Sequence, residues 1–182
     1  MIPNIYGKMY LEKYKQLATT PLSRKIHLAR WNLIYKYLKF GVILDYGCGP
    51  NTFNSYAPVE YTVFGYDINP ECKQSKIPEV NFNAVTFWDS LEHIHNFYNE
   101  IEKLKPDYLF ISTPNLKSVK NGIIDWKHYR PQEHIYYFDI DSLIVILANL
   151  GYKILESNYI EGQLRDPDNP EAILTIVAQR DQ

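Results

Sequence analysis

The chain has 182 residues, of which 46% are hydrophobic and 22% are charged, and its formal net charge is −2. These values are ordinary for one globular domain with a buried core, and the net charge gives no sign of a general polyanion-binding protein. No stretch stays apolar for the roughly 18 residues that a membrane-spanning helix needs. The first residues lack a secretion signal, and two cysteines are too few for a zinc motif or a disulfide framework, so we expect a cytoplasmic protein.

The first half of the chain alternates between helical and extended patterns. Two helices separated at Pro21 are expected first, over residues 8–20 and 22–39. Strands are then expected over residues 41–46, 61–66 and 83–88, and an aspartate closes or directly follows the last two.

The second half continues the alternation and ends differently. A helix is expected over residues 91–104 and a strand over 108–112, followed by a polar, irregular loop at 116–137. A helix over 139–149 then precedes two strands, 152–160 and 172–179, which are predicted to pair as an antiparallel hairpin across a connection at 161–171.

This order predicts an α/β fold with a Rossmann-like, doubly wound, mostly parallel sheet and an antiparallel hairpin at the end. We expect a single domain over residues 1–182, with N-terminal helices in 1–39 and the sheet in 40–182. Ligands of such sheets bind at the carboxyl ends of the strands. Polar residues fall at those ends in this chain, namely Asp45, Asp67, Asp89 and Asn115.

The most informative stretch is residues 42–49, where a hydrophobic strand runs into Asp-Tyr-Gly-Cys-Gly. Gly47 and Gly49 let the backbone approach a ligand, because a Cβ there would block the ligand or forbid the backbone angles. The pattern is typical of a nucleoside-binding turn. The carboxylate of Asp45 suits an ammonium or sulfonium group and repels a phosphate, which favours S-adenosylmethionine over NAD or ATP.

With these residues the chain resembles the class I S-adenosylmethionine-dependent methyltransferases over about residues 40–160. It is similar to small phage and bacterial methyltransferases, and also to the ubiquinone-biosynthesis O-methyltransferase group. Five signals in order carry the resemblance: the glycine turn at 45–49, Asp67, the stretch 87–94, the strand end at 112–115, and Pro-Gln-Glu-His at 131–134.

The resemblance implies that Gly47, Cys48 and Gly49 contact the methionine part of S-adenosylmethionine, with Asp45 near its amino group. It also implies that Asp67 accepts hydrogen bonds from the ribose hydroxyls, which suits an ionised acceptor facing two vicinal donors. The alternative for Asp45 and Asp67 is to cap the turns after their strands. The predicted cofactor-binding set is completed by Ile68, Trp88 and Asp89, and the product would be S-adenosylhomocysteine.

Two features depart from the family pattern. Pro50-Asn51 replaces the third small residue of the turn, and Asn is a residue that can adopt a positive φ. Residues 68–82 are too few for the helix-plus-strand unit that these enzymes carry there, since a parallel crossover needs a dozen or more residues before its strand. We therefore expect a sheet shortened around the usual third strand, with adenine recognition falling to other residues.

Asp89, Glu92 and His93 are expected at a helix start, where positions i, i+3 and i+4 share one face. The predicted catalytic residues are Glu92, His93 and His134, which would position or deprotonate the acceptor. A divalent metal held by Asp89, Glu92, His93 and His134 is less favoured. The resemblance supports that metal, because ubiquinone O-methyltransferases and small-RNA 3′-terminal 2′-O-methyltransferases have a similar acid-x-x-Glu-His site. The third interpretation is helix capping alone.

No Asn-Pro-Pro-Tyr or Asp-Pro-Pro-Tyr follows the strand at 83–88, so the pattern of amino-base methyltransferases is absent. We therefore expect methyl transfer to oxygen in a small-molecule, sugar or lipid-like acceptor, by a monomer or homodimer. One alternative is a metal-assisted RNA 2′-O-methyltransferase, for which loop 116–137 offers Lys117, Lys120, Lys127 and Arg130. Another is a catalytically silent module that binds the cofactor or a partner. Arg30 is expected on a solvated helical face, with contact to the cofactor's carboxylate as the alternative.

Overall fold

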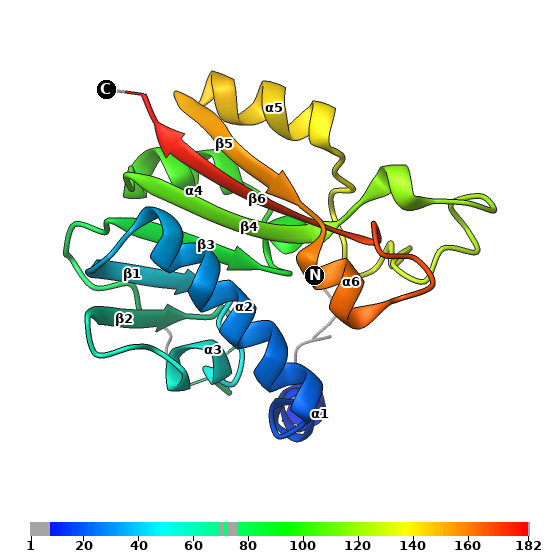
Figure 1. Ribbon diagram of the computed structural model, residues 1–182, viewed down its shortest axis with the longest axis horizontal. Coiled ribbons are helices and arrows are strands. Elements are labelled where there is room, and N and C mark those ends of the chain that lie inside the picture. Colours follow the sequence, from blue (N-terminus) through cyan, green and yellow to red (C-terminus); the bar gives the residue numbers. More distant parts are fainter. Residues whose placement is uncertain (1–7, 70, 73–75, 182) are drawn as a thin grey trace.

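The computed structural model describes residues 8–69, 71–72 and 76–181 (Figure 1). Its strands are β1 Gly41–Tyr46, β2 Tyr61–Tyr66, β3 Ala84–Trp88, β4 Tyr108–Pro114, β5 Tyr152–Asn158 and β6 Ile173–Arg180. Its α-helices are α1 Lys8–Ala18, α2 Pro21–Tyr37, α3 Thr52–Ser55, α4 Phe97–Leu104, α5 Ile140–Asn149 and α6 Ile160–Arg165. Two 3-10 turns complete the elements, η1 Leu91–His93 and η2 Leu116–Ser118.

The described strands form one sheet in the order β2-β1-β3-β4-β6-β5. The first four strands are parallel, and β6 runs antiparallel to both β4 and β5. This arrangement confirms the predicted Rossmann-like α/β fold with its antiparallel hairpin. Because the parallel strands are in register, Asp45 in β1 lies between Gly65 of β2 and Thr86 of β3.

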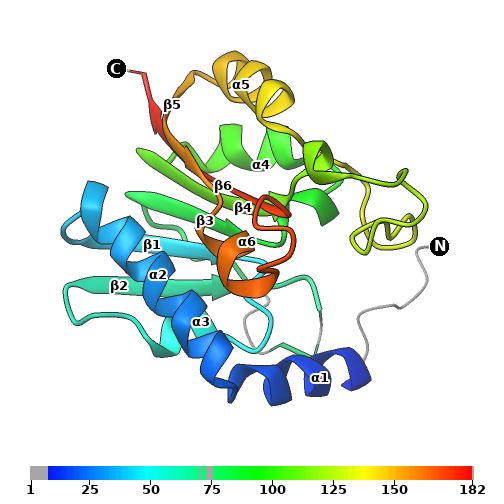
Figure 2. The same cartoon turned by 45° about the vertical axis from the view of Figure 1, so that its right-hand side comes forward.

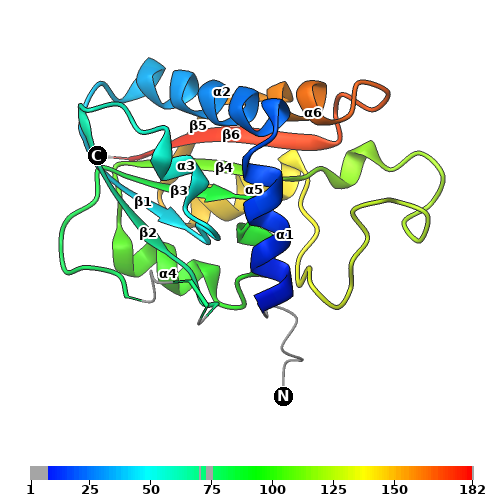
Figure 3. The same ribbon diagram turned by 90° about the horizontal axis from the view of Figure 1, so that it is seen from below.

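Helices cover both faces of the sheet, as Figure 3 shows. On one face α4 and α5 pack through residues such as Phe97 and Leu143 against Leu44, Val85 and Leu109 of the strands. On the other face α2 and α3 pack through Trp31 and Phe53, and the indole of Trp31 donates to the Phe53 carbonyl at 3.2 Å. These two apolar layers hold the carboxyl ends of the parallel strands in place.

The predicted shortening of the sheet is confirmed. Between β2 and β3, the described residues of segment 67–83 contain neither a strand nor a helix, so β2 is an edge strand. Residues 70 and 73–75 of that segment lie outside the described part of the chain, as do residues 1–7 of the predicted N-terminal region.

The prediction of one helix over 91–104 is wrong for the first turn. The chain forms η1, leaves helical geometry at 94–96, and enters α4 at Phe97. The carbonyl of Glu92 explains the break, because it accepts the N–H groups of Ile135 and Tyr136 at 2.9 and 3.2 Å. A continuing α-helix would have needed that carbonyl for residue 96.

The connection predicted at 161–171 also differs, because it contains α6. This short helix begins where the Asn158 side chain accepts the N–H of Ile160 at 3.1 Å. Its second residue, Glu161, is fully buried against α2. A six-residue helix of this kind is stabilised by long-range contacts rather than by its own propensity.

Candidate active site

The glycine turn after β1 has the conformation that a ligand-binding turn requires. Gly47 has φ +83°, and a Cβ on it would lie 2.4 Å from Cβ of Ser90. Gly49 has φ +51°, and a Cβ there would meet no described atom within 4 Å, so this part of the backbone is open to a ligand. Asn51 takes the left-handed conformation with φ 64°, as expected for the position where the family has a small residue.

Asp67 connects the turn to the end of β2. Its carboxylate accepts the N–H of Gly49 at 2.7 Å and that of Asn69 at 2.8 Å, one on each oxygen. Asp67 therefore does cap the turns that follow β1 and β2, as the alternative interpretation expected. Each carboxylate oxygen has a second lone pair, so the same group can also accept hydrogen bonds from a diol.

Asp45 is buried at the penultimate position of β1 and accepts the Thr86 hydroxyl at 2.8 Å. Burial raises the pKa of Asp45 to about 7, against the smaller opposing effect of the Thr86 hydrogen bond. A cationic ligand group beside this carboxyl would favour its ionised form.

The remaining predicted cofactor residues lie in different environments. Cys48 and Trp88 are buried, whereas Ile68, two residues after the end of β2, is 80% exposed. The guanidinium of Arg30 lies 4.7 Å from the centroid of the Trp88 ring. Asp89 directly follows β3 with φ 54° and is bound by arginines.

Glu92, His93 and His134 form one compact group, referred to below as the Glu92 cluster. One ligand-type atom from each of the three residues lies within 4.8 Å of the others. The His93 and His134 rings meet edge to face with centroids 4.7 Å apart. The loop at 116–137 delivers His134, because its end is hydrogen-bonded to the Glu92 carbonyl. The structure thus brings together the three predicted catalytic residues.

The Glu92 cluster contains buried polar atoms that the chain leaves unsatisfied. Oε2 of Glu92 and Nδ1 of His134 have no hydrogen-bond partner among the described residues. Nδ1 of His93 lies 2.8 Å from the Glu133 carbonyl, which can only accept, so Nδ1 carries the proton and Nε2 the lone pair. Buried polar groups without partners are costly unless a ligand satisfies them.

Burial also shifts the protonation of these groups. It raises the pKa of Glu92, and the nearby charge of Asp89 raises it further. Burial lowers the pKa of His134 to about 4, helped by His93, and lowers the pKa of His93 as well. Both imidazoles are consequently neutral at pH 7, which is the form in which an imidazole can bind a metal ion.

Asp89 does not join the Glu92 cluster. Both of its oxygens accept from Arg165, at 2.9 and 2.6 Å, and Oδ2 also accepts from Arg30 at 3.2 Å. The premise that Asp89, Glu92 and His93 share a helical face is wrong, since residue 89 precedes a 3-10 turn in left-handed backbone geometry. The two arginines hold the pKa of Asp89 well below its usual range, although burial opposes them.

Arg30, Glu161 and Arg165 are site-adjacent residues that sequence reasoning missed or misplaced. Arg30 is buried rather than solvated, and it donates through Nε and Nη2 to the two oxygens of Glu161, both at 2.7 Å. Arg165 donates to the same carboxylate. The i,i+4 spacing of Glu161 and Arg165 is a local signal that could have indicated their pairing, but none marks the contact with Arg30, which is 131 residues from Glu161 in the chain.

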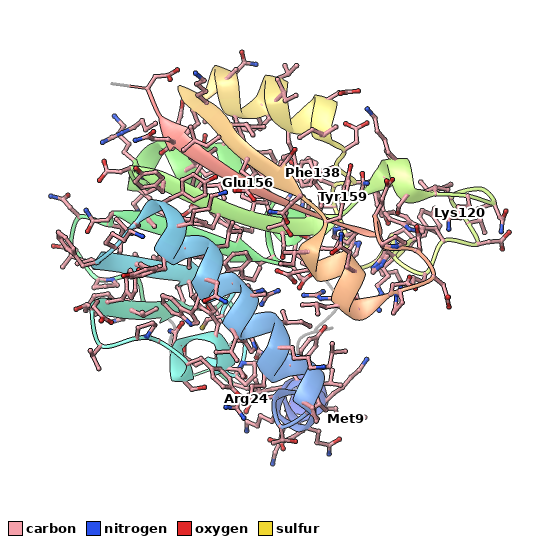
Figure 4. The ribbon with its side chains drawn as sticks, viewed as in Figure 1. Met9, Arg24, Lys120, Phe138, Glu156 and Tyr159 are labelled. Atoms are coloured by element: carbon pink, nitrogen blue, oxygen red, sulfur yellow. The ribbon has the colours of Figure 1, made fainter. Side chains whose placement is uncertain are left out.

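The cations of loop 116–137 are engaged within the chain. Lys117 pairs with Asp141 at 2.5 Å, Lys127 with Asp166 at 2.5 Å, and Arg130 with Glu133 at 3.2 Å. Lys120, labelled at the tip of the loop in Figure 4, donates to the Asp168 carbonyl at 3.2 Å. The expected basic groove is thus largely neutralised by neighbouring acids.

The fold, the glycine turn and the acid at the end of β2 define a Rossmann-like protein of the class that binds S-adenosylmethionine. A family model described as a methyltransferase domain matches residues 14–157, and the chain belongs to that family. It is an S-adenosylmethionine-dependent methyltransferase. A search of curated proteins found no match. Within the described ranges, no helix is long and apolar enough to cross a membrane.

Solved structures agree on the fold. The small RNA methyltransferase HEN1 matches with a TM-score of 0.64 at 16% identity over 89% of this chain, which spans only 26% of the HEN1 chain. A SAM-dependent methyltransferase from Archaeoglobus fulgidus matches with 0.59 at 22% identity, covering 86% of this chain and 94% of that one. The Haloferax volcanii complex of the Trm112 activator with a methyltransferase matches with a TM-score of 0.66 at 11% identity. This match covers 97% of this chain and 96% of that one.

Proposed function

We propose that the protein transfers the methyl group of S-adenosylmethionine to an oxygen atom of a small-molecule, sugar or lipid-like acceptor. The observation that supports this proposal best is the Glu92 cluster. Its neutral imidazoles and unsatisfied Glu92 oxygen lie beyond the carboxyl end of β3, at the edge of the sheet where such folds bind ligands. A hydroxyl group could provide hydrogen bonds to the buried atoms of this cluster that have no partner among the described residues.

For the cofactor, we propose that Gly47, Cys48 and Gly49 bind the methionine part and that Asp45 attracts its ammonium group. Asp67 would accept the ribose hydroxyls with the lone pairs that Gly49 and Asn69 leave available. The open backbone at Gly49 supports this assignment. We place the adenine end near Ile68, which follows the edge strand β2 and is exposed, and keep Trp88 and Asp89, at the carboxyl end of β3, as further proposed cofactor contacts.

Bound S-adenosylmethionine supplies a methyl carbon already activated by the sulfonium. The protein then has to align the acceptor and remove its proton. His134 is the proposed base, because its neutral ring is buried in the loop and Nδ1 has no partner among the described residues. Glu92 and His93 would orient the hydroxyl that His134 deprotonates.

Methyl transfer to a panel of phenolic, sugar and lipid-like hydroxyl compounds, followed by S-adenosylhomocysteine release, tests this proposal. Oxygen-methylated product should appear with the wild type and fall by at least about 100-fold in His134→Gln. Cofactor affinity should be unchanged in that variant, since His134 is not in the proposed cofactor site. Transfer to nitrogen, or full activity of His134→Gln, would contradict the assignment.

A second candidate is metal-assisted 2′-O-methylation of RNA. The close approach of one carboxylate and two imidazoles favours it, because these groups suit a divalent transition metal and two of their buried atoms have no partner among the described residues. Glu92, His93 and His134 would hold the ion, and the ion would orient the hydroxyl. The name of the HEN1 neighbour fits this candidate, whereas the paired cations of loop 116–137 weaken it.

Metal dependence separates the two candidates. Activity on short RNA that is lost with a chelator and restored by manganese would favour the second. Manganese should then also raise the melting temperature of the wild type but not that of Glu92→Gln.

We further propose a cytoplasmic location, which the two buried free cysteines, Cys48 and Cys72, support.

A further inference from the structure

The side-chain charges of this protein are divided unevenly along the chain. Residues 8–40 contain eight Lys and Arg residues against the single acid Glu12, whereas residues 41–182 contain eleven against twenty acids. The overall charge of −2 therefore hides a basic N-terminal helical pair on an acidic sheet domain. Such asymmetry points to an anionic partner for the basic part.

The basic charge is concentrated where α1 turns into α2, residues 8–28, referred to below as the α1–α2 elbow. Lys8, Lys13, Arg24 and Lys25 are exposed there and have no carboxylate partner within the part of the chain that the structure describes. The basic residues of loop 116–137 differ from them, since three of the four Lys and Arg residues of that loop pair with acids. The elbow thus has charge available for a ligand.

Apolar side chains are exposed among these cations. Met9 is 87% exposed, and Leu17, Leu22 and Leu28 are each exposed by more than two fifths. Among the α1 side chains that the structure describes, only Leu11 is buried, so α1 rests on the domain with one narrow stripe. Figure 4 shows Met9 and Arg24 at the same end of the molecule, away from Lys120.

A shallow surface hollow of about 480 Å³ lies in the elbow. Arg24 and Lys25 line it together with the threonines at 19 and 20, Leu28 and Tyr56 of α3's C-terminal end. Cations and hydroxyls suit a phosphate, and the adjoining leucine and tyrosine suit the glycerol and upper acyl region of a lipid.

We propose that the α1–α2 elbow docks the protein on an anionic phospholipid surface. Exposed leucines and a methionine interleaved with free lysines favour a membrane over a nucleic acid, because phosphates of a nucleic acid offer these apolar groups no partner. Figure 2 shows α1 beneath the carboxyl ends of the strands, and Figure 3 shows it crossing close to them. Docking by this face would hold the active-site edge of the sheet near the surface.

Co-sedimentation with phosphatidylcholine vesicles, with and without phosphatidylglycerol, tests the proposal on the full chain without any acceptor. The wild type should bind only the vesicles that contain phosphatidylglycerol, and the binding should weaken with salt. Changing Lys13, Arg24 and Lys25 together to Gln should lower the partition coefficient on the order of 100-fold. A control with Lys103, Lys105 and Lys153 changed to Gln removes the same charge from exposed positions elsewhere and should bind like the wild type.

A second variant separates the lipid surface from other polyanions. Met9→Ser with Leu17→Ser keeps every charge and should still lose most vesicle binding, because the apolar contacts are removed. Absence of binding to phosphatidylglycerol vesicles would overturn the proposal, as would an equal loss in the lysine control. RNA binding that needs Lys13, Arg24 and Lys25 but not Met9 and Leu17 would assign the elbow to nucleic acid instead. None of these results depends on the proposed methyl acceptor.

Discussion

Replacing Glu161 with Ala removes the shared acceptor of the buried Arg30 guanidinium and the half-buried Arg165 guanidinium. Glu161 is fully buried, and it receives two hydrogen bonds from Arg30 and one from Arg165. After the substitution Asp89 alone faces both arginines. Because the arginines stay charged at any accessible pH, the protein cannot avoid the cost by deprotonating them.

The expected loss is about 3 kcal/mol in the free energy of unfolding. Breaking a buried ion pair by removing one partner costs about 3–5 kcal/mol, and the remaining contacts to Asp89 place this case at the lower end. For a domain of this length, the melting temperature should fall by about 6–12 °C. That loss is a substantial share of the roughly 5–15 kcal/mol that stabilise most domains.

Urea unfolding of Glu161→Ala and of a matched control, Glu156→Ala, would measure the effect. Glu156 pairs with Lys36, whose side chain is 60% exposed, and also accepts the Tyr37 hydroxyl at 2.5 Å, so its loss should cost about 1–2 kcal/mol. The combined variant Arg30→Met with Glu161→Leu should recover part of the lost stability, because it removes the unpaired charge together with its partner. Equal stability of the Glu161 and Glu156 variants, or no recovery in the combined variant, would refute this reasoning.

Three further predictions concern the cofactor site. Since burial raises the pKa of Asp45 to about 7, this carboxyl is protonated below that pH in the free protein. The affinity for S-adenosylhomocysteine, measured by calorimetry, should therefore fall about tenfold for each pH unit below 7. The Asp45→Asn variant should lose this pH dependence. Asp67→Ala should weaken the same binding by at least about tenfold, and unchanged heats would contradict the ribose assignment. Gly47→Ala, whose Cβ would lie 2.4 Å from Ser90, should destabilise the fold by about 2–4 kcal/mol, whereas Gly122→Ala, with φ +91° but open space around it, should cost about 1–2 kcal/mol.

Much of the fold could be predicted from local patterns. Runs of β-forming apolar residues placed all six described strands within about two residues of their observed ends. The short segment between β2 and β3 predicted the missing strand, because chain length alone limits what can be built there. The positive φ of Asn51 likewise followed from residue type.

The candidate site was predictable only in part. Glu92 and His93 stand out in the sequence because they are adjacent, and His134 because it follows a polar loop. Their approach to within 4.8 Å depends on hydrogen bonds from Ile135 and Tyr136 to the Glu92 carbonyl, which also end the expected helix. Helix propensity favoured one continuous helix over 91–104, and a tertiary contact overrode it.

The sequence by itself determined the parallel sheet, the glycine turn and the acids at the strand ends, because strand periodicity and turn chemistry are properties of neighbouring residues. Only the tertiary structure decided that Asp89 pairs with Arg30 and Arg165 while Glu92 meets two histidines. It also decided which cations are available: Lys117, Lys127 and Arg130 of the loop meet acids, whereas Lys13, Arg24 and Lys25 of the α1–α2 elbow meet none among the described residues. Two charges pair only when they lie close together in space. Residues far apart in the chain come close only when the sheet folds.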